Sequence, residues 1–351
     1  MGVSIVEVSP RDGLQNEAAI VPAADKLALI GALAASGVRR IEAVSFVNPK
    51  RVPQMADAEE VSAGLPRGHV SWIGLVLNER GLDRAIAAGM DEVNVVVVAT
   101  DTFSRRNQGV DTDAAIGAWS RIAGRARESG LRTTVTIGAA FGCPFEGEVP
   151  LDRLRSVVAR CADAGPDELA LADTIGVGVP AQVREIVAAS DLPTTVTVSV
   201  AFGCPFEGRV DPARVEELCE QLDGACELVL ADTIGVATPT RVRRLVERVS
   251  ILGRPVGVHL HNTRNTGYAN AVAALEASAT VFDASLGGVG GCPYAPKATG
   301  NIATEDLLYL LHRSGFPTGM DVDALLPLGE RLGALLGHQV PGQLARAGVF
   351  P

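Results

Sequence analysis

The stretch Ser4-Ile5-Val6-Glu7-Val8, followed at once by Ser9-Pro10-Arg11-Asp12, is an apolar strand pattern that ends in two charged residues. A similar arrangement occurs far along the chain, where Val258-His259-Leu260-His261 is a strand pattern carrying two histidines. Because side chains alternate along a strand, both imidazoles lie on one face. Two imidazoles, a carboxylate and a guanidinium at strand ends are the parts of a divalent-metal site with an anion stabiliser. Either motif alone is more often packing or a surface ion pair, but their co-occurrence favours a shared metal site.

Short strand patterns alternate with amphipathic helical patterns along the chain, such as those at 23–36 and 268–278. We predict strands near residues 3–8, 38–45, 70–76, 92–98, 132–138, 168–172, 194–200, 227–231, 255–261 and 279–284. This alternation is typical of a parallel sheet, in a barrel or a doubly wound fold. Reactive side chains follow the strands, as they do at the carboxyl-terminal face of a (β/α) barrel. No Gly-x-Gly-x-x-Gly follows the first strand, so the sequence favours an α/β fold of the TIM (β/α)8 barrel type.

Ten predicted strands exceed the eight of such a barrel, and a repeat within the chain accounts for the excess. Phe-Gly-Cys-Pro-Phe-Glu-Gly occurs at 141–147 and at 202–208, and Leu-Ala-Asp-Thr-Ile-Gly-Val occurs at 171–177 and at 230–236. We interpret this as an internal duplication that adds two extra βα units, with copies at about 132–192 and 193–251. The whole chain, 1–351, is then expected to be a single catalytic domain that ends in a helical segment at about 303–351.

We expect one copy to complete an eight-stranded barrel and the other copy to be displaced from it. An eight-stranded interior is just filled by side chains, whereas a wider ring needs bulkier residues than these Val-, Ala- and Gly-rich strands provide. A displaced copy would expose an apolar face and favour association, so a homo-oligomer is expected, most simply a dimer.

Composition restricts the class of protein. The chain of 351 residues is 47% hydrophobic with a net charge of −10, which argues against sequence-independent binding to nucleic acid. No run of 18 or more apolar residues is present and no signal-like pattern opens the chain, so no membrane partner is expected. Six cysteines without Cys-x-x-Cys spacing indicate neither a disulfide framework nor a zinc ribbon. These features predict a cytoplasmic protein.

Several long motifs follow one another in a characteristic order. They are residues 9–17, 41–57, the repeated Gly-Cys-Pro-Phe-Glu-Gly and Ala-Asp-Thr-Ile-Gly-Val elements, His259-Leu260-His261, 287–294 and 298–306. In these motifs the chain resembles the 3-hydroxy-3-methylglutaryl-CoA lyase family, from about residue 3 to residue 335, apart from one redundant copy. The broader superfamily holds metal-dependent aldolases and acyl-CoA condensing enzymes on the same barrel.

The resemblance implies an acyl-CoA substrate and a divalent cation, Mg²⁺ or Mn²⁺. The implied metal ligands are Asp12, His259, His261 and Asn301. The implied catalytic residues are Arg11, Glu42, Cys292, Glu305 and the aspartate of the repeated turn, which is either Asp173 or Asp232.

The implied reaction is a retro-Claisen cleavage of 3-hydroxy-3-methylglutaryl-CoA to acetoacetate and acetyl-CoA, a step of leucine degradation and ketone body formation. Arg11 would face the developing enolate oxygen, and Cys292, in a glycine-rich loop, would donate a proton. His261, Asp12 and a hydroxide on the metal are each candidates for the general base. Glu305 follows Asn301 by four residues, so we expect both on one helical face, where Glu305 could orient a ligand, as could Glu42.

Two other functions fit the same residues. One is a related lyase or aldolase that acts on another 3-hydroxyacyl-CoA or on a 2-oxo acid. The other is an inactive or assembly protein, in which the repeat has disrupted the barrel.

Overall fold

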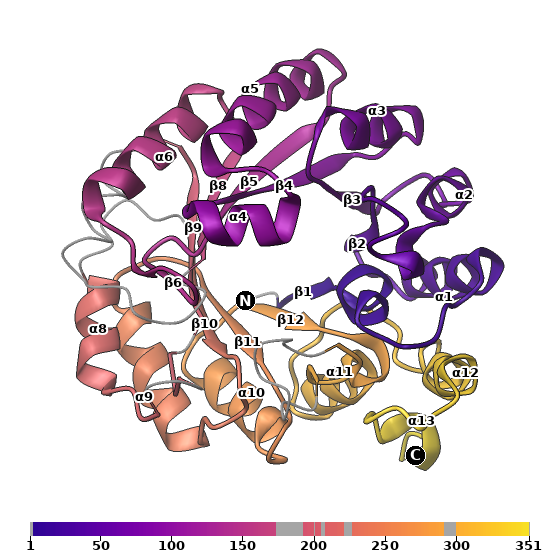
Figure 1. Ribbon diagram of the computed structural model, residues 1–351. Helices are drawn as coiled ribbons and strands as arrows, with labels where there is room; N and C mark the ends of the chain where they lie inside the picture. The colour runs from indigo at the N-terminus through magenta and orange to yellow at the C-terminus, as the bar shows by residue number, and fades with distance from the viewer. Residues whose placement is uncertain are drawn as a thin grey trace.

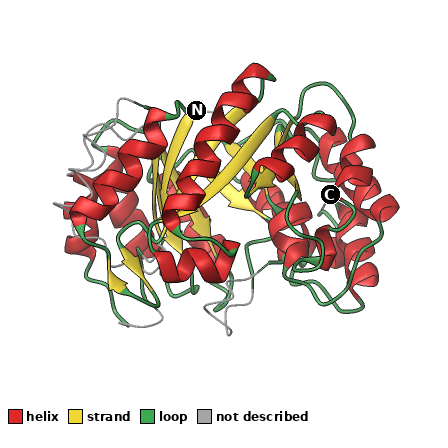
Figure 2. Ribbon diagram, turned by 45° about the horizontal axis from the view of Figure 1, so that its top comes forward, coloured by secondary structure: helices red, strands yellow, loops and turns green. Residues whose placement is uncertain are grey.

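The computed structural model describes residues 3–172, 192–199, 201–204, 208–220, 227–290 and 300–350. In this part of the chain ten parallel strands close into one barrel, and helices surround it (Figure 1). Figure 2 shows the same layering from another side, with the helices flanking the strands. The predicted α/β class with a closed parallel barrel is confirmed. The barrel strands are β1 (Ser4–Glu7), β2 (Arg40–Ser45), β3 (Ser71–Val76), β4 (Glu92–Val98), β5 (Arg132–Gly138), β8 (Glu168–Ala172), β9 (Thr194–Val198), β10 (Glu227–Asp232), β11 (Val256–Leu260) and β12 (Val281–Ala284).

The helices pack an apolar face on the barrel and expose the opposite face. In α5 (Thr112–Glu128), the Asp111 side chain accepts a hydrogen bond from the backbone N–H of Ala114 (2.9 Å), which caps the helix, while Trp119 and Ile122 are buried. The other helices are α1 (Ala23–Ala35), α2 (Ala58–Ala63), α3 (Glu79–Ala87), α4 (Asp101–Gln108), α6 (Leu151–Asp163), α8 (Pro212–Glu220), α9 (Pro239–Ser250), α10 (Gly267–Glu276), α11 (Thr304–Arg313), α12 (Leu326–Leu336) and α13 (Leu344–Ala347), with short turns η1 (Ser9–Gly13), η2 (Pro53–Met55) and η3 (Leu286–Gly288). None of the helices in the described ranges combines the length and apolar composition needed to cross a bilayer.

The expectation of an eight-stranded ring with one displaced copy is wrong. Around the barrel the strands run β1-β12-β11-β10-β9-β8-β5-β4-β3-β2, and β2 pairs again with β1. Strand β8 of the first copy and strand β9 of the second copy lie between β5 and β10. They pair with each other and with these two strands, so both edges of each are hydrogen-bonded. A displaced pair would leave such edges open, and the structure avoids that by widening the ring.

The wider ring encloses a cavity of about 510 Å³ that the strand side chains do not fill. Part of its lining is polar and is contributed by Arg40, Asn94, Thr134, Thr136, Glu168, Thr195, Glu227 and Asp283. Several of these groups bond to neighbours: Arg132 contacts Glu168 at 2.6 Å, and the Thr195 hydroxyl donates to Glu168 at 2.9 Å. The interior is therefore under-packed, as the sequence indicated for a wide ring, but a polar lining lets water occupy it.

The cysteine and the last glycine of the repeated turn pair in the same antiparallel way in both copies. In the first copy β6 (Gly142–Cys143) pairs with β7 (Gly147–Glu148), and Cys143 lies opposite Gly147. In the second copy Cys204 lies opposite Gly208 in the same antiparallel bridge. Cys143, Cys161, Cys204 and Cys219 are buried, and none of these four forms a disulfide. Burial raises the pKa of both Cys161 and Cys219 to about 12.

Candidate active site at the carboxyl ends of β1, β10 and β11

Two histidines meet at the carboxyl end of β11. The ring centroids of His259 and His261 are 4.9 Å apart, with an interplanar angle of 76°. The Nδ1 atom of His261 lies 3.1 Å from the main-chain oxygen of Asp232 at the end of β10. The Nδ1 atom of His259 lies 3.4 Å from Oδ2 of Asp283 on β12. The alternation expected for the strand therefore brings both imidazoles together, and each ring is held through Nδ1.

The two rings experience different electrostatic surroundings. Burial lowers the pKa of His261 to about 3, and the nearby His259 adds to this effect. Burial also acts to lower the pKa of His259, but the carboxylates of Asp283, Asp12 and Asp232 together outweigh it, so the pKa of His259 is raised. His261 is thus a neutral imidazole at physiological pH, the form in which histidine binds metals.

The first motif lies at β1 and β2, which are neighbours in the ring, and β12 separates β1 from β11. The turn η1 follows β1 and carries Arg11, whose guanidinium binds Glu42 and donates to Asp12 at 3.0 Å. Glu42 lies at an irregularity in the register of β2, where the local bulge aims its side chain inward. Among the described residues, the buried Nε of Arg11 has no hydrogen-bond partner, and an unsatisfied buried donor of this kind is typical of a functional site.

Gly290, just after η3, lies close to both η1 and Asn301. Gly290 has a φ of +94°, and a Cβ there would lie 3.1 Å from the side-chain nitrogen of Asn301 and 3.2 Å from Cα of Gly13. Asn301 forms a backbone bridge with His261, and its side-chain nitrogen donates to the oxygen of Val289 at 3.3 Å. Among the described residues, nothing donates a hydrogen bond to the amide oxygen of Asn301.

The donor types fit a divalent cation, but the side chains are not gathered into a finished cage. Within the described ranges, no three His, Cys, Asp or Glu side chains converge closely enough to hold a metal by themselves. Asp12, whose side chain is 38% exposed, directs Oδ1 to Arg11. Two imidazole nitrogens, an amide oxygen and a movable carboxylate are a mixed N/O set that suits Mg²⁺ or Mn²⁺. The predicted ligand set of Asp12, His259, His261 and Asn301 stays a prediction.

Of the two repeated aspartates, Asp232 is next to the histidines. Its carboxylate accepts the backbone N–H groups of Val236 (2.8 Å) and Ala237 (3.0 Å), and burial raises its pKa. Its main-chain oxygen anchors His261. Asp173 lies outside the described residues, as does Cys292, but Asp173 directly follows β8, which is separated from β11 by β9 and β10.

Glu305 does not share a helical face with Asn301, so that expectation is wrong. Helix α11 begins at Thr304, so Asn301 lies before the helix. Asn301 forms a backbone bridge with His261 instead. Glu305 is fully buried and accepts the backbone N–H of Gly287 at 3.0 Å. In these contacts Glu305 holds the η3 turn, and a direct catalytic role for it stays a prediction.

Burial raises the pKa of Glu305 from 4.5 to about 8. A raised pKa means that this carboxyl stabilises the fold fully below about pH 4.5 and loses that contribution as the pH rises through about 8. Over this interval we expect the free energy of unfolding of the unmodified protein to fall by ~2–4 kcal/mol. Glu305→Gln should not show this fall, because the amide stays neutral. Denaturant unfolding at about pH 5 and about pH 8.5 checks this, with Glu247→Gln, an exposed carboxylate on α9, as the control. An unchanged pH slope in Glu305→Gln would contradict the assignment.

Sequence reasoning missed Asp283. It is an acidic residue between Phe282 and Ala284, both buried, and a charge at an inward position of an apolar strand was the signal available. Its contact with His259 depends on the pairing of β11 with β12, which the sequence of either strand does not reveal.

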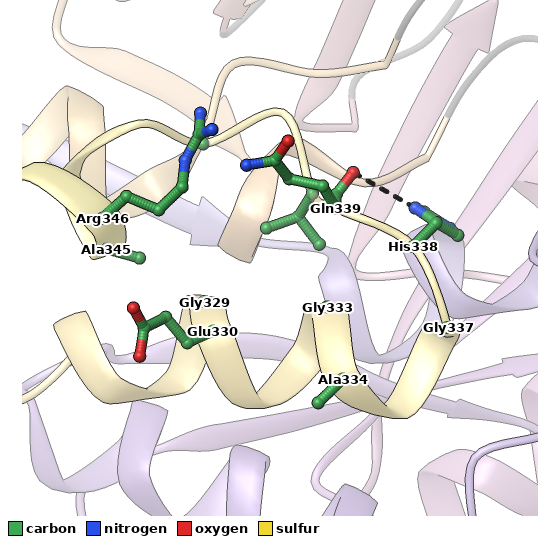
Figure 3. A pocket seen from close by; sticks show the side chains of 11 residues that line it. Gly329, Glu330, Gly333, Ala334, Gly337, His338, Gln339, Ala345 and Arg346 are labelled. Carbon is green, nitrogen blue, oxygen red and sulfur yellow. Dashed lines mark hydrogen bonds between the residues drawn. The ribbon is translucent and has the colours of Figure 1, made fainter.

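A second cavity, of about 430 Å³, lies between α12 and α13, and neither His259 nor His261 lines it (Figure 3). Its lining is mostly glycine and alanine, with Glu330, His338 and Arg346 at its edges. None of the predicted site residues lines it, so the candidate site is the strand-end cluster.

Comparison with known proteins shows which family and which enzymes the chain is similar to. A profile of the HMGL-like family matches residues 2–197 and again residues 187–331. The (R)-citramalyl-CoA lyase of Chloroflexus aurantiacus is 39% identical over 99% of this chain and 96% of its own length. The hydroxymethylglutaryl-CoA lyase of Pseudomonas mevalonii is 36% identical over 95% of this chain and 93% of its own length.

Solved structures agree with these sequence matches. An HMG-CoA lyase from Acinetobacter baumannii, in complex with coenzyme A and 3-methylmalate, matches with a TM-score of 0.67 and 34% identity. The match covers 99% of this chain and 95% of that one.

Proposed function

This chain belongs to the HMGL-like family of lyases, and on that premise we propose that it cleaves 3-hydroxy-3-methylglutaryl-CoA to acetoacetate and acetyl-CoA. The observation that carries the proposal is the contact of Arg11 with Glu42 and Asp12 after β1, which only β12 separates from the strand of the histidine pair. An acyl-CoA substrate is supported by the related lyase that binds coenzyme A.

The chemistry is a retro-Claisen reaction. The tertiary hydroxyl loses its proton, the bond between its carbon and the carbon next to the thioester breaks, and the thioester enolate then takes up a proton. A divalent cation held by Asp12, His259, His261 and Asn301 would polarise the substrate's hydroxyl and carboxylate oxygens and lower the pKa of the hydroxyl.

The side chains of this protein have separate tasks in that reaction. Arg11, fixed by Glu42, stabilises the negative charge that develops on the enolate oxygen. Asp12 accepts the hydroxyl proton, and Cys292 returns a proton to the enolate carbon. Asp232 holds the turn beside His261, so we assign the role of the repeated aspartate to the second copy.

A second candidate substrate is citramalyl-CoA, because a citramalyl-CoA lyase is 39% identical to this chain. Both thioesters carry a tertiary hydroxyl β to the thioester carbonyl and a terminal carboxylate, and they differ by one methylene. A methylene is discriminated by only about 1–3 kcal/mol, or roughly 10–200-fold in kcat/KM. The same machinery therefore serves either substrate, and the pocket decides between them.

A direct assay separates these candidates. Purified full-length protein with Mg²⁺ or Mn²⁺ is given each thioester, and acetyl-CoA is measured together with acetoacetate or pyruvate. We expect kcat/KM for 3-hydroxy-3-methylglutaryl-CoA to exceed that for citramalyl-CoA by about tenfold or more. The reverse ratio would assign the protein as a citramalyl-CoA lyase. Absence of acetyl-CoA from both, with metal bound, would favour the inactive or assembly protein.

The remaining expectations are part of the same proposal. The chain acts as a single catalytic domain, in the cytoplasm, as a homodimer, with no nucleic-acid or membrane partner. Size-exclusion chromatography with light scattering measures the oligomeric state.

A further inference from the structure

The carboxylate of Asp283 lies at the junction between the wide barrel interior and the histidine pair. On β12 it is in register with Val6 of β1 on one side and with His259 of β11 on the other. Because residues paired across a parallel sheet present their side chains to the same face, Asp283 and His259 both point inward. Asp283 lines the 510 Å³ cavity, and its Oδ2 lies 3.4 Å from Nδ1 of His259.

The nitrogen that Asp283 contacts determines what the other nitrogen can do. An imidazole that presents Nδ1 to a carboxylate carries its proton there and leaves Nε2 as a lone-pair donor. His261 is held in the matching way, through Nδ1 to the main-chain oxygen of Asp232 at 3.1 Å. Both rings are therefore held through Nδ1, by a carboxylate in one case and a carbonyl in the other.

We propose that Asp283 is a positioning residue, whose carboxylate fixes His259 with Nδ1 toward β12 and Nε2 toward the metal site. The proposal rests on the proposed function, since it takes His259 as a metal ligand. Carboxylates in this place fix the tautomer and ring orientation of a ligating histidine and increase its basicity.

Asp283 differs from Glu168, another acid that lines the cavity, and from Glu92 on β4. Glu168 is neutralised by Arg132 at 2.6 Å, and Glu92 by Arg40 at 2.9 Å. Within the described residues, the ion pair of Asp283 is with His259, not with an arginine. Its charge is thus directed to the histidine, while the charges of Glu168 and Glu92 are compensated by arginines at the strand beginnings.

Two readouts that do not depend on turnover test the proposal. In the metal-free protein, side-chain ¹⁵N NMR, assigned with His259→Ala, reports which nitrogen of His259 carries the proton. A Mn²⁺ titration followed by electron paramagnetic resonance reports the metal Kd. We expect an Nδ1-protonated His259 in the unmodified protein and a mixed tautomer in Asp283→Ala. We expect Asp283→Ala to weaken Mn²⁺ binding roughly 10–100-fold.

Two further variants make the test specific. Asp283→Asn should lose less affinity for Mn²⁺ than Asp283→Ala, because its amide oxygen still accepts a hydrogen bond from Nδ1–H. If Asp283→Ala does not fold, the near-isosteric asparagine variant provides the test. Glu168→Gln is the matched control, because Glu168 lines the same cavity but its carboxylate contacts Arg132 at 2.6 Å. It should leave both readouts unchanged.

The outcomes separate this proposal from the proposed function. A Kd for Mn²⁺ within twofold of the unmodified value, with an unchanged tautomer, in the folded alanine or asparagine variant would overturn the role of Asp283. If both readouts change as expected but neither thioester is cleaved, Asp283 keeps its role and the proposed function fails.

Discussion

His261→Ala is expected to lose metal retention and lyase activity together. His261 is 3% exposed and bridged to Asn301, so removing its imidazole takes away one ligand and empties the space beside another. A bound cation supplies several kcal/mol of transition-state stabilisation, so we expect turnover to fall by roughly 10³-fold or more. Asp12→Ala should have the same result with less effect on the fold, since Asp12 is partly exposed.

Metal analysis of the purified variants and the acetyl-CoA assay measure these effects. His69→Ala is the matched control, because His69 is an exposed histidine that contacts the main-chain oxygen of Ala34, in α1 on the barrel's outer side. It should retain metal and activity. Near-normal turnover of His261→Ala or Asp12→Ala, with metal supplied, would refute the ligand assignment.

Deletion of residues 142–202 is expected to yield a folded, active, eight-stranded barrel. The join places Phe141 before Gly203 and restores an unbroken Phe-Gly-Cys-Pro-Phe-Glu-Gly turn. The deletion removes β8 and β9 and lets β5 pair with β10, while Asp232 stays beside the histidines. An eight-stranded interior is filled by side chains, so the 510 Å³ cavity should disappear. We expect a stability gain of ~2 kcal/mol, or about 4–8 °C in Tm.

Calorimetry and the thioester assay check this result. Deletion of residues 70–130 is the matched control: it removes the same length and also leaves eight strands, but it takes out β3 and β4, which the sequence does not repeat. That variant should not fold. A 142–202 deletion that is unfolded, or folded without activity, would show that β8 and β9 are required parts of this barrel.

Sequence reasoning located all ten barrel strands to within a few residues, because strand patterning is a local property. The strand predicted at 194–200 is β9, Thr194–Val198, and the strand predicted at 227–231 is β10, Glu227–Asp232. The same locality placed Arg11 and His261 at strand ends, and adjacent strands of a closed ring then bring such residues together. The histidine pair and the Arg11–Glu42 contact could be anticipated in this way.

The expectation of eight strands failed for a physical reason. It assumed that side chains must fill the barrel interior, but a barrel interior with polar side chains can also hold water. The Thr195 hydroxyl on β9 donates a hydrogen bond to Glu168 on β8. A polar lining of this kind tolerates a cavity that an apolar lining would not. Open strand edges cost more than a hydrated interior, and the ring expanded.

By itself, then, the sequence determined the strands, the order of the βα units and the residue types that reach the barrel's carboxyl-terminal face, since each depends on neighbours along the chain. Tertiary structure alone decided how many strands share one ring, which repeated aspartate adjoins His261, that Glu305 holds the η3 turn, and that Asp283 meets His259. These depend on pairing between strands and turns far apart in the chain, such as Val6 with Asp283 or Glu305 with Gly287. Such pairing is a property of the closed barrel, because only closure brings the first strand beside the last.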